Sequence, residues 1–176
     1  ASDVYKRQLL TSDKNLQHSV ELYSLTKGYS MAGWRVGFAV GNTDAVAAVT
    51  KLKSYIDYGT FQPIQIASTV ALNELDDYPF ELSAVYKERR ELVVEHLEDL
   101  DFNVQESDAT MFVWAKLPEK FKKDSLKFSL DILEKSNVAV SPGVGFGKFG
   151  EGYIRIALVE NKQRIRQAMK NIKAAL

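Results

Sequence analysis

Short apolar runs alternate with helical patterns through the second half of this 176-residue chain, and this alternation limits its fold more than any other feature. Runs rich in Val, Ile, Phe and Tyr are typical of strands, and apolar residues three or four apart are typical of helices. We therefore expect strands at 102–105, 111–117, 138–141 and 153–158, and helices at 79–100, 124–135 and 161–176. Strands interleaved with helices pack as a sheet covered by helices, so the sequence predicts an α/β fold.

The first half of the chain carries fewer regular elements. The apolar run 36–40, followed by Gly41 and Asn42, predicts a buried strand and a turn. Apolar residues at helical spacing predict a helix from 44 to 56, and Pro63 predicts the first turn of another helix that ends near Leu75. The long helix at 79–100 would then link two domains.

The run from Ser24 to Gly37 carries the most informative chemistry. It reads Ser-Leu-Thr-Lys-Gly-Tyr-Ser-Met-Ala-Gly-Trp-Arg-Val-Gly. The amine of Lys27 can form a Schiff base with an aldehyde once its surroundings favour the neutral form. Arg35 offers a planar fork of N–H donors that matches phosphate oxygens, and the Ser24 hydroxyl adds one hydrogen bond. A single lysine is usually a solvated surface charge, but the whole run at fixed offsets favours a phosphorylated aldehyde cofactor.

This run resembles the lysine segment of the class I/II, fold-type I, pyridoxal-phosphate-dependent aminotransferases. It is most similar to bacterial alanine (glutamate–pyruvate) aminotransferases and to aspartate or LL-diaminopimelate aminotransferase-like enzymes. The family pattern is Ser, any residue, Ser or Thr, Lys, then an aromatic residue, Asn, Met and Gly-Trp-Arg. This chain departs from the pattern at Ser30, which stands where the family has Asn. The resemblance extends from about Glu21 to Leu176.

The resemblance implies the C-terminal part of the fold-type I large domain, followed by the small α/β C-terminal domain. We expect residues 1–10 to be a leader that is artefactual or foreign to the family. Residues 11–80 would belong to the cofactor-binding large domain, and 81–176 would form the linking helix and the small domain. Because the upstream part of the family's chains supplies further cofactor contacts, we expect this C-terminal fragment to be inactive by itself.

The resemblance also implies an enzyme that binds pyridoxal 5'-phosphate. It would move an amino group between an L-amino acid (alanine or glutamate) and a 2-oxo acid (pyruvate or 2-oxoglutarate). Lys27 would be the catalytic residue, which carries the cofactor and then moves the substrate's proton, with Ser24 and Arg35 on the cofactor phosphate. A homodimer and a cytoplasmic location are expected. Tyr58 and Thr60 would approach the active site of the partner subunit, although a buried Tyr58 in a helix connection explains that segment equally well.

Arg155 is the second candidate for binding an anion. On a strand, Ile154 and Ile156 share one face while Tyr153 and Arg155 share the other. An arginine in the middle of a strand is costly to bury unless an anion meets it. The resemblance makes Arg155 the substrate-binding residue that holds the α-carboxylate. An ion pair with a nearby Asp or Glu is the alternative.

The glycine-rich loop 143–150 admits three interpretations. Gly145, Gly147 and Gly150 formally match a dinucleotide-binding fingerprint, but a strand and not a helix is expected after them. A phosphate-binding P-loop fails because Pro142 stands at its first glycine and Phe149 at its Ser or Thr. The loop resembles the segment beside the substrate entrance in the aminotransferase family.

Composition excludes several other classes of function. The 23 basic residues balance the 23 acidic ones, which argues against a nucleic-acid or membrane-surface partner. The chain has no cysteine, and His18 and His96 are isolated, so no metal site is expected. No apolar run is long enough to span a bilayer.

Two rival functions share the same residues. A lyase or decarboxylase of the same fold would use the same lysine and cofactor. An aminotransferase-like ligand-sensing domain of a transcription regulator would keep the motif and follow a DNA-binding segment. Aspartate or LL-diaminopimelate also remains open as the substrate, because an α-carboxylate is common to all amino acids.

Overall fold

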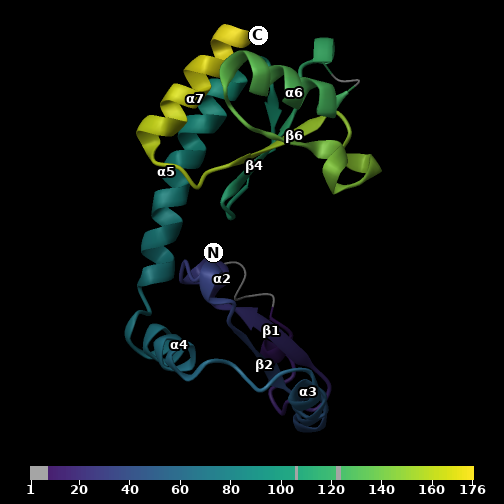
Figure 1. Cartoon of the computed structure of the whole chain (residues 1–176), viewed down its shortest axis with the longest axis vertical. Coiled ribbons are helices and arrows are strands. Elements are labelled where there is room, and N and C mark those ends of the chain that lie inside the picture. The colour runs from purple at the N-terminus through teal and green to yellow at the C-terminus, as the bar shows by residue number, and fades with distance from the viewer. Residues whose placement is uncertain (1–7, 106, 122–123) are drawn as a thin grey trace. The chain divides into compact units, whose positions relative to one another are not determined.

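The chain folds into two compact units, which are residues up to Leu82 and residues Ser83–Leu176. A computed structural model describes residues 8–105, 107–121 and 124–176 (Figure 1). Most of the expected leader, residues 1–7, therefore lies outside the described residues. Helix α5 (Tyr78–Glu98) runs from the first unit into the second.

The first unit is built on an antiparallel pair of strands. Strand β1 (Val20–Ser24) pairs with β2 (Gly37–Gly41) in a register that sets Val20 opposite Gly41 and Ser24 opposite Gly37. The unit also contains three short helices, η1 (Leu9–Thr11), α2 (Leu25–Gly28) and η2 (Ala32–Trp34). Two longer helices follow, α3 (Thr43–Ile56) and α4 (Gln62–Glu74). A small core forms around Leu25, Met31 and Ala71.

Both longer helices of the first unit begin at clear local signals. The Asn42 side chain accepts a hydrogen bond from the Ala45 backbone N–H (2.9 Å), which satisfies one free donor at the start of α3. Pro63 stands in the first turn of α4, where its missing N–H costs nothing. The helices expected at 44–56 and from Pro63 to Leu75 are confirmed.

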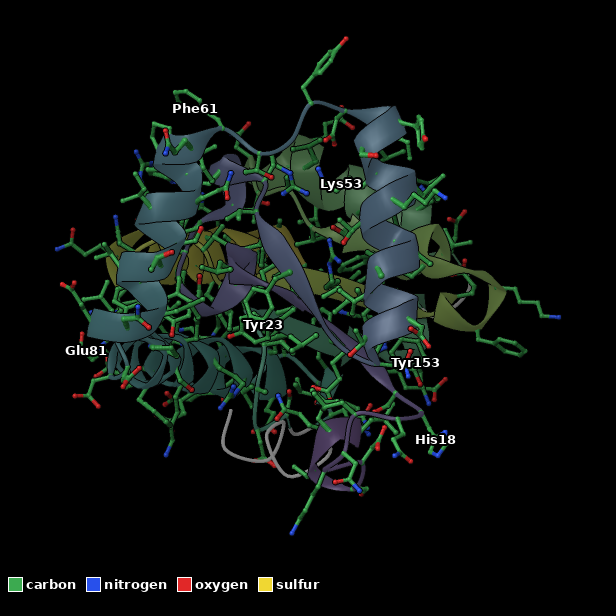
Figure 2. All side chains as sticks on the ribbon, turned by 90° about the horizontal axis from the view of Figure 1, so that it is seen from below. His18, Tyr23, Lys53, Phe61, Glu81 and Tyr153 are labelled. Atoms are coloured by element: carbon green, nitrogen blue, oxygen red, sulfur yellow. The ribbon has the colours of Figure 1, made fainter. Side chains whose placement is uncertain are left out.

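Strand β2 forms where expected, but the expectation that it is buried is wrong. Phe38 and Val40 are each 39% exposed, and Leu22 on the paired strand is 83% exposed. An open groove lies between the strand pair and α3, with Tyr23 and Lys53 among its lining residues (Figure 2). A two-stranded sheet buries little of its own side chains, so the apolar run specifies a strand while only packing neighbours can bury it.

The second unit is a four-stranded antiparallel sheet with helices on one face (Figure 1). Its strand order is β3-β4-β6-β5, at Asn103–Val104, Phe112–Lys116, Tyr153–Ala157 and Ser141–Pro142. Helices α6 (Ser125–Ser136) and α7 (Lys162–Ala175) and the last turns of α5 supply the covering side chains. Short 3-10 turns η3, η4 and η5 lie at Glu119–Phe121, Gly143–Phe146 and Lys148–Gly150.

The core of the second unit follows the alternation read from the sequence. Strands β4 and β6 bury every second residue toward the helices, and α7 buries one stripe. The fully or nearly fully buried members include Val93, Leu97, Val113, Ala115, Ile154, Ile156, Ile165, Met169 and Ile172. The predicted α/β fold is confirmed.

The strand expected at 138–141 is largely wrong. Helix α6 ends where Asn137 takes a left-handed conformation, with φ 56°. Val138 and Val140 then pack against the core, but pairing with β6 begins only at Ser141. Apolar side chains can thus point inward without the backbone joining the sheet.

None of the helices in the described part of the chain is long and apolar enough to cross a membrane.

Candidate functional site

Lys27 lies on α2, the single helical turn that directly follows β1. The Ser24 hydroxyl oxygen caps this turn by accepting a hydrogen bond from the Thr26 backbone N–H (3.3 Å). Leu25, which is fully buried, holds the turn against the core of the first unit. Ser24 and Lys27 are both exposed on the surface of that unit.

Pairing of the two strands brings Arg35 back toward the same turn. Ser24 lies opposite Gly37, and the Leu25 backbone N–H donates to the Val36 carbonyl oxygen (3.3 Å). A Cβ atom at Gly37 would lie 2.5 Å from the Tyr23 carbonyl oxygen, so this close approach requires glycine. The run 24–37 therefore folds back on itself, which places Arg35 two residues before the pairing partner of Ser24.

Arg35 is held in an uncommon backbone conformation, with φ 51° and ψ 51° in the left-handed region. Its Nη1 donates a hydrogen bond to the Ala32 carbonyl oxygen (3.0 Å), and its side chain is exposed. A residue other than glycine pays about 1–2 kcal/mol for this conformation, and such strain is concentrated at functional sites. The tight turn between η2 and β2 imposes it here.

The donor set of this run fits a phosphorylated aldehyde. The Ser24 oxygen accepts from Thr26, which leaves its own hydroxyl proton for an external acceptor. Of the five N–H donors of Arg35, one is given to Ala32, and within the described ranges no carboxylate forms an ion pair with its guanidinium. The hydroxyl of Ser24 and the remaining N–H groups of Arg35 can thus meet a phosphate, and Lys27, which is exposed on the same turn as Ser24, carries the amine that an aldehyde carbon needs.

Arg155 lies at the middle of β6, in the second unit. Its register partners are Trp114 on β4 and Ser141 on β5. The neighbours Ile154 and Ile156 are buried on the opposite face, so the alternation expected from the sequence is confirmed. The guanidinium is therefore on the sheet face that the helices do not cover.

Two aromatic rings enclose the Arg155 guanidinium. Its Cζ lies 4.1 Å from the ring centre of Phe112 and 4.3 Å from that of Phe146. The Nε atom is buried and has no hydrogen-bond partner in the described part of the chain. The ion pair considered as an alternative is not formed, since no described Asp or Glu lies within salt-bridge distance of Arg155.

An unpartnered buried N–H on a cation is a strong indication that a ligand belongs there. Buried polar groups are normally hydrogen-bonded, and leaving one unpaired costs about 1–3 kcal/mol, more for a charged group. A planar carboxylate can accept two parallel N–H bonds from a guanidinium, which would remove this cost.

The glycine-rich loop forms two 3-10 turns and leads into β6, so the context for dinucleotide binding is absent. The Val144 backbone N–H donates to the hydroxyl of Ser125, the first residue of α6 (3.2 Å). Ser125 in turn donates its backbone N–H to the Glu151 carboxylate (2.7 Å). Hydrogen bonds from the backbone N–H groups of Ser125 and then Gly152 hold the pKa of Glu151 below its ordinary value. The loop is thus tied to the start of α6.

Tyr58 and Thr60 lie in the exposed segment between α3 and α4. The Tyr58 side chain is fully exposed, so the alternative of a buried tyrosine in a helix connection is wrong. The segment ends at Phe61, which precedes the first turn of α4 (Figure 2).

Sequence reasoning missed the roles of four residues: Phe112 and Phe146 contact Arg155, while Ser125 and Glu151 hold the glycine-rich loop. Phe112 and Trp114 are two residues apart on β4 and therefore lie on the same face of the strand, and the sequence already shows this spacing. Phe146, Ser125 and Glu151 carry no such signal, because each lies in a different element.

The fold places the chain among aminotransferases. A solved aminotransferase from Staphylococcus aureus superposes with a TM-score of 0.85 at 34% sequence identity, over 96% of this chain and 44% of that one. Residues 2–172 match the family model "Aminotransferase class I and II", so the chain belongs to the class I and II aminotransferases. The match begins within the segment 1–10 that we expected to lie outside the family.

Curated relatives give the same family. The chain is 54% identical over 90% of its length to AatC of Rhizobium meliloti, which is named as an aminotransferase. It is 45% identical over 89% of its length to the glutamate–pyruvate aminotransferase AlaC of Escherichia coli. It is also 45% identical over 98% of its length to the LL-diaminopimelate aminotransferase of Natranaerobius thermophilus. The chain spans 39%, 38% and 44% of the lengths of these three relatives.

Proposed function

We propose that this chain is part of a pyridoxal-phosphate-dependent aminotransferase that transfers an amino group between an L-amino acid and a 2-oxo acid. The family supports the reaction class, and the relative named as a glutamate–pyruvate aminotransferase supports alanine with glutamate, and pyruvate with 2-oxoglutarate, as substrates. The observation that carries the proposal is Arg155, a half-buried arginine that lies between two aromatic rings and whose buried Nε has no hydrogen-bond partner in the described part of the chain.

The cofactor role rests on the run 24–37. Pyridoxal phosphate, when bound, supplies an aldehyde carbon and an electron-withdrawing ring. Lys27 would bind the aldehyde carbon through Nζ. The Ser24 hydroxyl and the N–H groups of Arg35 that do not contact Ala32 would bind the phosphate oxygens.

Lys27 would also move the proton. When it is not bonded to the cofactor, Nζ would take the proton from the substrate α-carbon as a general base and would return it as a general acid. Arg155 would orient the amino acid for this transfer by binding its α-carboxylate through two parallel N–H bonds.

A second substrate pair deserves equal testing. The LL-diaminopimelate aminotransferase is as similar to this chain, at 45% identity, as the glutamate–pyruvate enzyme. Product analysis with L-alanine plus 2-oxoglutarate, and separately with LL-diaminopimelate plus 2-oxoglutarate, decides between them. An amine released without a matching oxo acid would point to a lyase or decarboxylase.

The proposal includes a cytoplasmic homodimer, in which Tyr58 and Thr60 approach the partner subunit's active site. Family resemblance supports this part. Sedimentation of the full-length protein tests the dimer.

Substitution of Lys27 tests the reaction. In the full-length protein, Lys27→Ala should remove the visible absorbance that a pyridoxal cofactor gains on joining a lysine, and should lower transamination by at least about a thousandfold. Lys53→Ala is the matched control, because Lys53 is an exposed lysine of the same unit that pairs with Asp57 (2.6 Å). If Lys27→Ala keeps the absorbance and the turnover of the control, the proposed function is wrong.

A further inference from the structure

The two rings that enclose Arg155 come from different elements. Phe112 lies on β4, the neighbouring strand, while Phe146 is the last residue of η4 in the glycine-rich loop. The guanidinium lies over both rings, and its Nε makes no hydrogen bond within the described ranges. Contacts with the two rings, rather than a hydrogen bond of Nε, therefore orient the guanidinium end of the Arg155 side chain.

Phe146 is braced by further aromatic contacts. Its ring packs edge-on against Trp114, with centres 5.5 Å apart and an angle of 79° between the planes. Trp114 in turn stacks on Tyr153, with centres 5.5 Å apart and 16° between the planes. These geometries are the favoured ones for aromatic pairs. The row Tyr153, Trp114, Phe146 therefore resists displacement of the Phe146 ring.

The backbone that carries Phe146 is anchored as well. Val144 donates its N–H to Ser125, and Ser125 is bound by Glu151, so the turn η4 is attached to the fully buried first residue of α6. Phe146 itself is half exposed. The anchor matters because a half-exposed ring on a short turn is not held by burial.

We propose that Phe112 and Phe146 are positioning residues that hold the Arg155 guanidinium in the orientation that binds a substrate carboxylate. This inference rests on the proposed function, because it assumes that Arg155 meets the α-carboxylate. A flexible arginine loses side-chain freedom when it binds, and fixing it beforehand lowers that cost. Ring faces attract a guanidinium without using its N–H groups, so the donors stay available for the carboxylate.

Exchange of Phe146 tests this role in the full-length protein. Phe146→Leu keeps an apolar side chain but removes the ring face. We expect the KM for L-alanine and for 2-oxoglutarate, and the dissociation constant of the unreactive probe propionate, to rise about five- to tenfold, while kcat stays within about twofold. Phe146→Tyr should restore all three constants to near the wild-type values.

Phe149→Leu is the matched control. Phe149 lies on the same loop, is 87% exposed, and contacts Lys148 instead of Arg155. This variant should bind propionate like the wild type. Phe112→Leu is the second test variant, because it removes a ring from the strand and leaves the loop unchanged.

The outcomes separate this inference from the proposed function. If both Phe146→Leu and Phe112→Leu bind propionate as tightly as the Phe149→Leu control, the positioning role is overturned while transamination and the Lys27 result stand. If Arg155→Lys does not weaken propionate binding, the carboxylate site itself is wrong and the positioning role falls with it. A KM effect that Phe146→Tyr fails to rescue also overturns the role assigned to the ring.

Discussion

Two glycines in one turn provide a sharp test of how the loop beside Arg155 is built. Gly143 and Gly145 both lie in η4. A Cβ atom at Gly143 would lie 2.6 Å from the Tyr153 carbonyl oxygen and even closer to the carbonyl oxygen of Gly150. At Gly145, a Cβ atom would meet no heavy atom within 4 Å. The same change, glycine to alanine, therefore clashes with backbone at one position and enters open space at the other.

The expected magnitudes follow from these contacts. Ordinary contacts of a Cβ atom begin at 3.4 Å, so Gly143→Ala must push apart two backbone segments that neighbour a strand. Overpacking of this kind costs about 1–3 kcal/mol, and we expect the upper part of that range because neither segment is a flexible side chain. Gly145→Ala should instead be neutral or stabilise by up to about 1 kcal/mol, because it restricts only the unfolded chain.

Urea denaturation followed by tryptophan fluorescence measures both effects. For the 176-residue chain, Trp34→Phe as the common background leaves Trp114, in the second unit, as the one tryptophan of these residues and hence as the reporter. For a domain of roughly 60–100 residues, the loss at Gly143→Ala corresponds to a fall in melting temperature of about 8–20 °C. Equal midpoints for the two alanine variants would refute the close approach of the two loop ends.

Two further predictions concern the first unit. Ser30 has a φ of 54° and accepts a hydrogen bond from the Tyr78 hydroxyl (3.1 Å). Ser30→Asn should raise the free energy of unfolding by about 0.5–1 kcal/mol, because asparagine tolerates the left-handed region better than serine does. A thermal melt that compares this variant with Ser30→Ala checks the prediction. The Asp13 carboxylate accepts backbone N–H bonds from His18, Gln17 and Ser19, which lower its pKa to about 2. Because the folded pKa lies below the ordinary value of 3.8, this stabilisation is present above about pH 4 and is lost as the pH falls through about 2. Melting temperatures between pH 5 and pH 2 should therefore fall less steeply for Asp13→Asn than for the wild type, and parallel curves would contradict the assignment.

Helices were predictable because their signals are local. Apolar spacing, the cap at Asn42 and Pro63 in a first turn place α3 and α4 within one or two residues of the expected ranges. Strand β1 was not predicted, although Val20 and Leu22 alternate with polar residues. The alternating run is short and overlaps the start of the lysine motif at Ser24, so the sequence analysis assigned this segment to the motif and not to a strand.

The candidate site was predictable only residue by residue. The resemblance picked out Lys27, Ser24 and Arg35, and strand parity set Arg155 opposite Ile154 and Ile156, as the structure has it. Strand alternation places Phe112 on the same face as Trp114, but the sequence does not show that Phe112 and Phe146 meet at Arg155. Phe112 and Phe146 are far apart in sequence, and no spacing rule connects a strand residue with a loop residue.

Local interactions determined the elements of this chain: helix spacing, caps and strand alternation act over a few residues, and the sequence by itself specifies them. The tertiary structure decided which side chains are buried and which groups contact one another. The apolar run 36–40 contributes a strand whose Phe38 and Val40 side chains stay exposed, and Arg155 lies against two rings while its Nε has no hydrogen-bond partner among the described residues. The physical reason is that burial and cation contacts depend on which distant segments come together, and that is a property of the packed chain as a whole.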